Sequence, residues 1–343
     1  MKASAVLTAL LLALPATALA ESEAQPATPL PVLNIEPDAI SVMGVSSGGY
    51  MATQLAVAWP ARFSGLAVFA AGPWGCARGT LSLALTQCMQ TRLGPPDLDV
   101  LQQRHTDYLH DERVGDPDDL ARQRVYLWHG GQDDTVDPQL GALLAEQYRT
   151  WLDDPESQLK VVTSPRAAHG WPVSASSAAV DCSQGGSPHL LDCGMDGAGQ
   201  ALQWIYANDL QPPTGDERGM LMPFDQAPFY DGRRLAETGY VYVPKACEEG
   251  APCALAVALH GCAMSTEQIG ETFVRESGLN AWAAANRIVV LYPQAEPSLP
   301  NPKACWDWWG YDESSWQRNP IYDTRQGRQV QAIKAMVDHV TGT

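Results

Sequence analysis

The segment Gly44-Val45-Ser46-Ser47-Gly48 constrains this chain more than any other, because it joins a β-rich run to a helical one. The run "AISVMGV" favours a strand, and residues 50–58 favour a helix. Small residues on both sides of a serine permit a sharp strand-to-helix turn that exposes the hydroxyl. The G-x-S-x-G spacing designates Ser46, not Ser47, as the candidate nucleophile. A glycine-rich turn without chemistry has the same pattern, so the other parts of a site must be identified separately.

Further segments repeat the strand-helix-strand rhythm of a parallel sheet covered on both faces, which predicts an α/β fold. Residues 76–122 are polar, and we expect them to form helical excursions over the site. Residues 172–234 are rich in Ser, Gly, Pro and Asp, and we interpret them as a long crossing connection that contains one helix. Strands are predicted at 64–72, 124–130, 158–164, 235–244, 253–261 and 286–294, and helices at 140–152 and 327–340.

Asp133 and His169 are candidates for the acid and the base that a serine nucleophile requires. A serine hydroxyl needs a base to accept its proton, and the base needs an acid to hold it in one tautomer. Each of the two residues directly follows a predicted strand, in the chain order Ser, Asp, His. Asp134 and Asp137 are rivals for the acid, although either could instead cap the next helix. We favour Asp133 because it is nearest the strand end.

The remaining six histidines fit structural roles better than catalytic ones. Three occur in polar segments and one in the last helix, and two precede the turns that carry candidate site residues. We expect the first four (His105, His110, His189 and His339) to lie at the surface, and the other two (His129 and His260) to form structural hydrogen bonds.

The segment "ALHGCA", residues 258–263, is the candidate for the second half of an oxyanion hole. A tetrahedral intermediate requires two N–H donors: that of the residue after the nucleophile, Ser47, and one from a loop that follows an early strand. Here the loop, with the N–H of Cys262, follows a late strand, and a strand that ends in a plain glycine turn also fits. If the last helix ends near "AISVMGV", a circular permutation preserves the sheet. The sequence thus predicts an α/β-hydrolase fold with the nucleophile half first and the oxyanion-loop half last.

The first twenty residues are typical of a secretory signal peptide. They contain one basic residue, an apolar run and the A-x-A site Ala18-Leu19-Ala20, so we predict cleavage after Ala20 and a periplasmic or secreted protein. Residues 21–37 are Pro-rich and predict an extended leader, and residues 38–343 predict one catalytic domain. We expect no membrane anchor. The formal net charge of −17, without a local Lys/Arg cluster, argues against binding of nucleic acid. The oligomeric state stays open.

The eight cysteines predict disulfides rather than metal ligands, because their number is even and the chain is expected to be exported. No Cys-x-x-Cys pair supports zinc, and no metal or cofactor is expected. Eight cysteines permit 105 pairings, and sequence alone cannot choose among them. Proximity suggests Cys76 with Cys88, Cys182 with Cys193, Cys247 with Cys253, and Cys262 with Cys305.

The sequence resembles the polyhydroxybutyrate depolymerase esterases at these residues. The resemblance spans most of the chain after the signal peptide, and the combination of HGC, YPQ and CWDWW is much more specific than G-x-S-x-G. The usual secreted members carry the HGC half first, so this chain looks like the circularly permuted single-domain branch. The resemblance implies Ser46 as nucleophile, Asp133 as acid, His169 as base, and the N–H groups of Ser47 and Cys262 as oxyanion hole. The matching segments are "GVSSGGYMA", "HGGQDDTV", "AAHGWP", "LHGCAMS", "LNAWAAANRIVVLYPQ" and "NPKACWDWWG".

The resemblance also implies an activity and a substrate class. The protein is expected to be an exported serine esterase that acts on short-chain 3-hydroxyacid polyesters or oligoesters. No separate polymer-binding domain is expected, because the chain ends soon after "CWDWWG". Trp306 and Trp309 are then candidates for an apolar binding platform, together with Trp308, which is the one of the three that we expect to pack in the core. A feruloyl or acetyl esterase, a hydrolase of oxidised polyvinyl alcohol, and a polymer-binding protein without catalysis remain alternatives.

Overall fold

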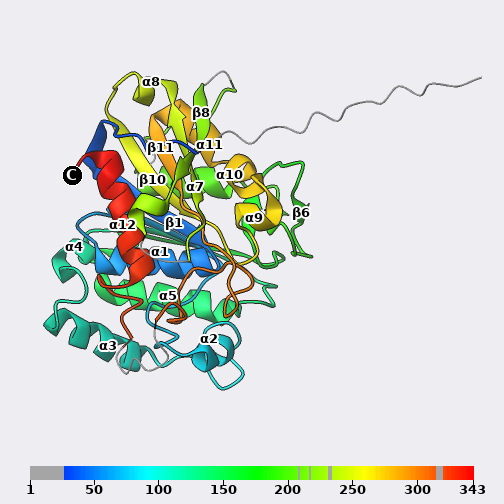
Figure 1. The fold of residues 1–343 in the computed structure, drawn as a ribbon. Coiled ribbons are helices and arrows are strands. Elements are labelled where there is room, and N and C mark those ends of the chain that lie inside the picture. Colours follow the sequence, from blue (N-terminus) through cyan, green and yellow to red (C-terminus); the bar gives the residue numbers. More distant parts are fainter. Residues whose placement is uncertain (1–26, 208, 216–217, 231–233, 314–319) are drawn as a thin grey trace, which may run out of the picture.

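An eight-stranded sheet forms the centre of the molecule (Figure 1). The computed structural model describes residues 27–343 except 208, 216–217, 231–233 and 314–319. All neighbouring strands pair in parallel except at one edge, where β9 (Thr238–Pro244) is antiparallel to both of its neighbours, β11 (Ile288–Tyr292) and β8 (Gly219–Asp225). In spatial order the strands are β4 (Leu159–Ser164), β3 (Arg124–Gly130), β2 (Gly65–Phe69), β1 (Ile35–Val45), β10 (Cys253–Leu259), β11 (Ile288–Tyr292), β9 (Thr238–Pro244) and β8 (Gly219–Asp225).

The order of these strands confirms the permuted α/β-hydrolase fold. If the strands of the large sheet are counted from β8 through the C-terminus and on into β1, their spatial order becomes 1-2-4-3-5-6-7-8, as in an α/β-hydrolase. Strand β1, which leads to Ser46, and strand β10, which leads to Cys262, are then parallel neighbours, with Val42 opposite Val257 and Gly44 opposite Leu259. Because the carboxyl ends of parallel neighbours meet at one edge, the loops after β1 and β10 lie together.

The end of the last helix lies beside the entry to β1, as the permutation requires. The N–H of Leu33 donates to the carbonyl of Val340 at 2.8 Å, and His339 Nε2 lies 2.8 Å from the carbonyl oxygen of Leu30. Figure 1 shows the C-terminus beside the blue segment at the start of β1. The two segments that a permutation separates in sequence therefore remain neighbours in space.

Helices cover both faces of the sheet, which explains why its central strands are continuously apolar. Ile40 and Val42 of β1 face the layer of α1, α5 and α12, whereas Met43 and Val45 face the layer of α7 and α11. All residues of α1 are buried. The helices are α1 (Ser47–Ala58), α2 (Leu81–Gln87), α3 (Leu98–His110), α4 (Pro117–Ala121), α5 (Pro138–Trp151), α6 (Pro155–Gln158), α7 (Gly197–Ile205), α8 (Lys245–Glu248), α9 (Thr266–Ile269), α10 (Thr272–Glu276), α11 (Leu279–Asn286) and α12 (Arg328–Thr341). Within the described residues, no helix is long and apolar enough to cross a membrane.

The strands and helices predicted from sequence are present, but the connection over 172–234 has more structure than expected. It contains α7, the edge strand β8, and parts of a small sheet of β5 (Trp171–Val173), β7 (Leu190–Asp192) and β6 (Val180–Asp181). Strand β8 was not predicted because Pro223 within it argues against a strand. An edge strand tolerates proline, because one side of its backbone has no neighbouring strand to bond. The expected leader is also shorter, since residues 35–37 already belong to β1. The predicted signal peptide lies outside the described residues.

The eight cysteines form the four disulfides that proximity suggests. The structure joins Cys76 to Cys88, Cys182 to Cys193, Cys247 to Cys253, and Cys262 to Cys305. The last bridge has the largest sequence separation and connects the loop after β10 to the tryptophan-rich segment. It therefore fixes two elements that border the candidate site.

The surface location expected for His105 is wrong. This side chain is 3% exposed on α3, and its ring packs against Trp74 and Trp151. Burial lowers the pKa of His105 to about 4, so the imidazole is neutral near pH 7. The polar residues that surround His105 in sequence lie on the outer face of α3. They suggested an exposed segment, although His105 itself points inward. His110 and His339 are exposed as expected.

Candidate active site

Ser46 occupies a strained backbone turn between β1 and α1. Its φ of 56° and ψ of −122° are unfavourable for a residue with a side chain, and such strain is typical of functional turns. The Ser46 N–H donates to the carbonyl of Phe69 on β2 at 2.9 Å. A side chain at Gly44 would collide with the backbone of Gly48, so this tight turn requires glycine there. The local geometry is that of the nucleophile elbow predicted from G-x-S-x-G.

Asp133 and His169 are joined by a short hydrogen bond at the carboxyl edge of the sheet. His169 Nδ1 lies 2.7 Å from Asp133 Oδ2, while Asp133 Oδ1 accepts the backbone N–H groups of Thr135 and Val136 at 2.9 and 2.8 Å. Burial raises the pKa of the Asp133 carboxyl, but hydrogen bonds from His129 and His169 outweigh burial and hold this pKa well below its usual range. Asp133 therefore remains a carboxylate that can orient His169.

His129 is a second imidazole at this carboxylate. Its Nε2 lies 2.9 Å from the carbonyl oxygen of Val136 and 3.3 Å from Asp133 Oδ2. This agrees with the hydrogen-bonding role expected for His129. The bond to Val136 also closes the turn that presents Asp133 to His169.

The two rival acids lie away from His169. Asp134 is exposed and its Oδ1 accepts the hydroxyl of Thr135 at 3.2 Å. Asp137 caps α5, where its Oδ1 accepts the N–H of Gln139 at 3.0 Å. Of the three carboxylates, only Asp133 contacts the candidate base.

The loop after β10 lies against the elbow. A side chain at Gly48 would collide with the carbonyls of Leu259 and His260, and a Cβ at Gly261 would lie 3.2 Å from that of Ser46. The N–H of Ser47 is in the first turn of α1, where helix geometry provides no partner. Among the described residues, the N–H of Cys262 donates to no acceptor. Two N–H groups are thus available on either side of Ser46, as an oxyanion hole requires.

A network of buried hydrogen bonds holds the loop after β10 on the side away from the pocket. The Nδ1–H of His260 donates to the carbonyl of Gly261 at 2.8 Å, and its Nε2 accepts the N–H of Ala295 at 3.1 Å. Burial lowers the pKa of His260 to about 4, which keeps the imidazole neutral and able to donate and accept at once. The indole N–H of Trp306 donates to the carbonyl of His260 at 2.9 Å. His260 has the hydrogen-bonding role that the sequence suggested.

The binding role expected for Trp306 is wrong, because this side chain is 0% exposed and does not line the site. Trp309 is half-buried and does line it. Trp308, which we expected in the core, stacks on Tyr50 with ring centroids 4.3 Å apart and is 5% exposed, yet it also reaches the site. The three tryptophans are close together in sequence. Which of them faces the pocket and which is buried depends on the path of the loop, which the sequence does not indicate.

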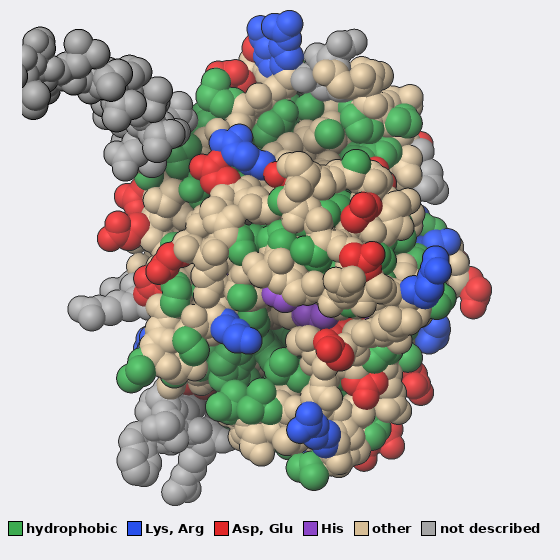
Figure 2. Space-filling model, turned by 90° about the vertical axis from the view of Figure 1, so that its right-hand side faces the viewer, with side chains coloured by type: hydrophobic (Ala, Val, Ile, Leu, Met, Phe, Trp, Pro, Cys, Tyr) green, Lys and Arg blue, Asp and Glu red, His purple; other side chains and the backbone are tan. Residues whose placement is uncertain are grey.

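Ser46 and His169 line one pocket of about 330 Å³. Figure 2 shows histidine side chains at the bottom of a hollow with hydrophobic side chains gathered beside it. Leu81 and Leu85 of α2 contribute apolar surface that is about half exposed. The lining residues are Ser46, Leu81, Ala84, Leu85, Met89, Thr135, His169, His189, Cys262, Ala263, Lys303, Cys305, Trp308 and Trp309. Helix α2 confirms that the polar segment after Cys76 reaches over the site.

His189 is a lining residue that sequence reasoning placed at the surface. Its ring centroid lies 6.2 Å from that of His169. Burial, assisted by the charges of His169 and Lys303, lowers the pKa of His189 to about 4. His189 lies in the loop that the Cys182–Cys193 disulfide closes, and this loop folds back to the pocket. The local sequence does not indicate that the loop turns in this direction.

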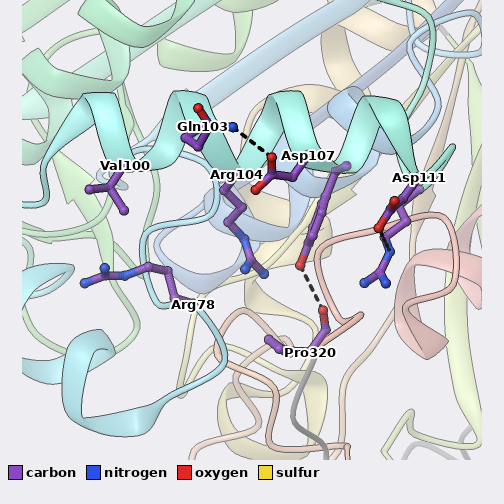
Figure 3. Close-up of a pocket in the computed structure, with 9 residues that line it drawn as sticks. Arg78, Val100, Gln103, Arg104, Asp107, Asp111 and Pro320 are labelled. Atoms are coloured by element: carbon purple, nitrogen blue, oxygen red, sulfur yellow. Dashed lines mark hydrogen bonds and ion pairs between the residues drawn. The ribbon is translucent and has the colours of Figure 1, made fainter.

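A larger hollow of about 590 Å³ lies over α3 and does not contain Ser46 (Figure 3). Its cationic side chains already have partners: Arg104 binds Asp323, Arg113 binds Asp111, and Arg78 donates to Gln87. The hydroxyl of Tyr108 donates to the carbonyl of Pro320 at 2.9 Å. The polar side chains that line this hollow are engaged in structural ion pairs and hydrogen bonds. The candidate site is therefore the smaller pocket, which contains Ser46.

The sheet order and the residues at its carboxyl edge define an α/β-hydrolase. No protein-family model matches the chain. A polyhydroxybutyrate depolymerase of Talaromyces funiculosus is 36% identical over 328 residues, which cover 92% of this chain and 93% of that protein. A poly(3-hydroxybutyrate) depolymerase of Delftia acidovorans is 36% identical over 321 residues, and the chain spans only 61% of its length.

Solved structures agree with these relatives. The crystal structure of PHB depolymerase from Penicillium funiculosum superposes with a TM-score of 0.84 at 34% identity, over 92% of this chain and 99% of that one. A serine-to-alanine variant of a PHB depolymerase complexed with an R3HB trimer gives the same values. The chain belongs to the polyhydroxybutyrate depolymerase family and is a carboxylic ester hydrolase.

Trp306→Phe tests whether the buried network positions the oxyanion loop. The substitution preserves an aromatic ring but leaves the carbonyl of His260 without its donor, which costs about 1–3 kcal/mol at a buried acceptor. We expect a lower melting temperature, and in steady-state hydrolysis of a nitrophenyl ester a lower kcat with little change in KM. Trp309→Phe is the matched control and is expected to alter mainly KM. An unchanged kcat in Trp306→Phe, despite reduced stability, would show that this bond does not position the loop.

Proposed function

We propose that this enzyme hydrolyses poly(3-hydroxybutyrate), or related short-chain 3-hydroxyacid polyesters and their oligomers, through an acyl-enzyme on Ser46. The observation that carries the proposal is one apolar pocket that joins Ser46, His169 and the free N–H of Cys262. Both relatives at 36% identity are named as depolymerases of this polyester, and one related structure holds an R3HB trimer.

The proposed chemistry follows from the positions of the side chains. His169 accepts the proton of the Ser46 hydroxyl as the oxygen attacks the ester carbonyl, while Asp133 holds His169 Nδ1–H and stabilises the imidazolium. The N–H groups of Ser47 and Cys262 stabilise the oxyanion. His169 then donates the proton to the leaving 3-hydroxyl, and the acyl-Ser46 ester remains. Water, activated by the same histidine, frees the acid and restores Ser46.

The walls of the pocket favour a substrate whose main body is weakly polar. Its walls are formed by leucines, Met89 and the tryptophans Trp308 and Trp309, and its lining contains no carboxylate. An aliphatic polyester with methyl branches offers apolar surface to such walls and ester carbonyls to the oxyanion donors. The polymer-binding reading without catalysis does not apply, since the chain is an ester hydrolase.

The proposed function includes export. The A-x-A site before Glu21 supports a cleaved signal peptide. The four disulfides support folding in an oxidising compartment. After expression with its native N-terminus, the mature protein is expected to begin at Glu21 by N-terminal sequencing. A protein of full length confined to the cytoplasm would contradict export.

The central test measures release of 3-hydroxybutyrate products from amorphous polymer and from the hydroxybutyrate trimer. The wild type is expected to degrade one or both, and Ser46→Ala is expected to lose turnover by a factor of about 10⁴ or more while remaining folded. Ser47→Ala is the matched control, because its proposed contribution is a backbone N–H that the substitution keeps, and it should retain most of the turnover. Hydrolysis of a nitrophenyl ester alone, without action on trimer or polymer, would refute the substrate; turnover by Ser46→Ala would refute the nucleophile.

A further inference from the structure

The pocket contains a single formally charged side chain, and that side chain is a cation. Among its lining residues, all within the described part of the chain, Lys303 alone carries a charge when the histidines are neutral, and no Asp or Glu is present. The chain as a whole has a formal net charge of −17. A lone ammonium at the mouth of an apolar pocket therefore gives this site a local charge opposite to that of the whole molecule.

The backbone of Lys303 is fixed beside the oxyanion loop. Its carbonyl accepts the N–H of Ala263 at 2.6 Å, one residue after Cys262. The Cys262–Cys305 disulfide ties the same two segments together, and Asn301 both donates to and accepts from the backbone of Cys305 at 2.8 and 3.0 Å. The position of the Lys303 Cα relative to the oxyanion donors is thus set by three constraints.

The side chain of Lys303 is exposed and available. Among the described residues, no carboxylate lies within ion-pair distance of its ammonium. In the hollow over α3, by contrast, Arg104 is paired with Asp323. An unpaired ammonium next to a substrate channel can bind an anionic group of the substrate without breaking an internal contact.

Lys303 shares the pocket with the histidine that must protonate the leaving group. The leaving oxygen must approach His169, which supplies its proton, and His189 flanks His169. Lys303 lines the same pocket as both histidines, so its flexible side chain can reach a group that leaves beside His169. In a 3-hydroxyacid oligomer the leaving fragment carries the free carboxylate at its far end, because each ester joins the carboxyl of one unit to the hydroxyl of the next.

We propose that Lys303 binds the terminal carboxylate of the leaving fragment, so that the enzyme favours ester bonds near the carboxyl end of short oligomers. This inference rests on the proposed polyester hydrolysis and adds a preference within it. Cleavage next to the last unit transfers the remaining acyl chain to Ser46 and releases a 3-hydroxyacid, whose new hydroxyl takes the proton from His169 and whose carboxylate is paired with Lys303.

The test compares the hydroxybutyrate trimer with its methyl ester, in which a neutral methyl ester replaces the terminal carboxylate; only cleavage of the bonds between hydroxybutyrate units is counted. For wild type, the ratio of kcat/KM for the free acid to kcat/KM for the methyl ester is expected to be about fivefold larger than for Lys303→Met, as for a partly exposed ion pair. Raising the ionic strength should reduce the ratio in wild type but not in the variant. Lys303→Arg keeps the charge and should largely restore the ratio.

Lys245→Met is the matched control, because Lys245 lies on α8 outside the pocket and its removal should not change the ratio. The methyl ester also serves as an internal control for folding, since each variant is compared with itself. Equal ratios in wild type and Lys303→Met, with both trimers hydrolysed, would overturn the role of Lys303 alone. If wild type degrades the amorphous polymer but neither trimer, this inference fails and the proposed function stands. If wild type degrades neither the polymer nor the trimers, both fail.

Discussion

The parallel pairing of β1 with β10 is the interaction on which the site depends. It places the end of the nucleophile strand beside the end of the strand that leads to His260 and Cys262. Gly48 then lets the first turn of α1 approach the carbonyls of Leu259 and His260 more closely than any side chain would allow. Residues from opposite ends of the chain thereby form one pocket, in which the loop that carries Cys262 lies against Ser46.

The rest of the structure holds this contact rigid. The neutral imidazole of His260, the indole of Trp306 and the Cys262–Cys305 disulfide constrain the loop after β10 from its buried side. The contact between Leu33 and Val340 keeps the two ends of the described chain together. Hydrogen bonds and packing are insensitive to where the termini fall, so the permuted order preserves the geometry that an α/β-hydrolase needs.

The fold and the candidate triad could be predicted because their signals are local. Apolar runs mark the strands, and the residues that immediately follow those strands, Asp133 and His169, must lie at one edge of a parallel sheet. The roles of Trp306 and Trp309 could not be assigned, because these depend on which way a loop without periodicity turns. His189 was missed for a similar reason, since a disulfide-closed loop brings it back to the site. His105 was misplaced because one buried residue on a polar helix leaves a weak periodic signal.

The measurement that tests this account most directly is a crystal structure of the enzyme after reaction with an alkyl phosphonate ester. The phosphorus is expected to be bonded to Ser46 Oγ, with one phosphonyl oxygen at about 3 Å from the backbone nitrogens of both Ser47 and Cys262. Such an adduct would show that the two ends of the chain form one oxyanion hole. A phosphonyl oxygen directed away from Cys262, or an adduct on another residue, would contradict the account.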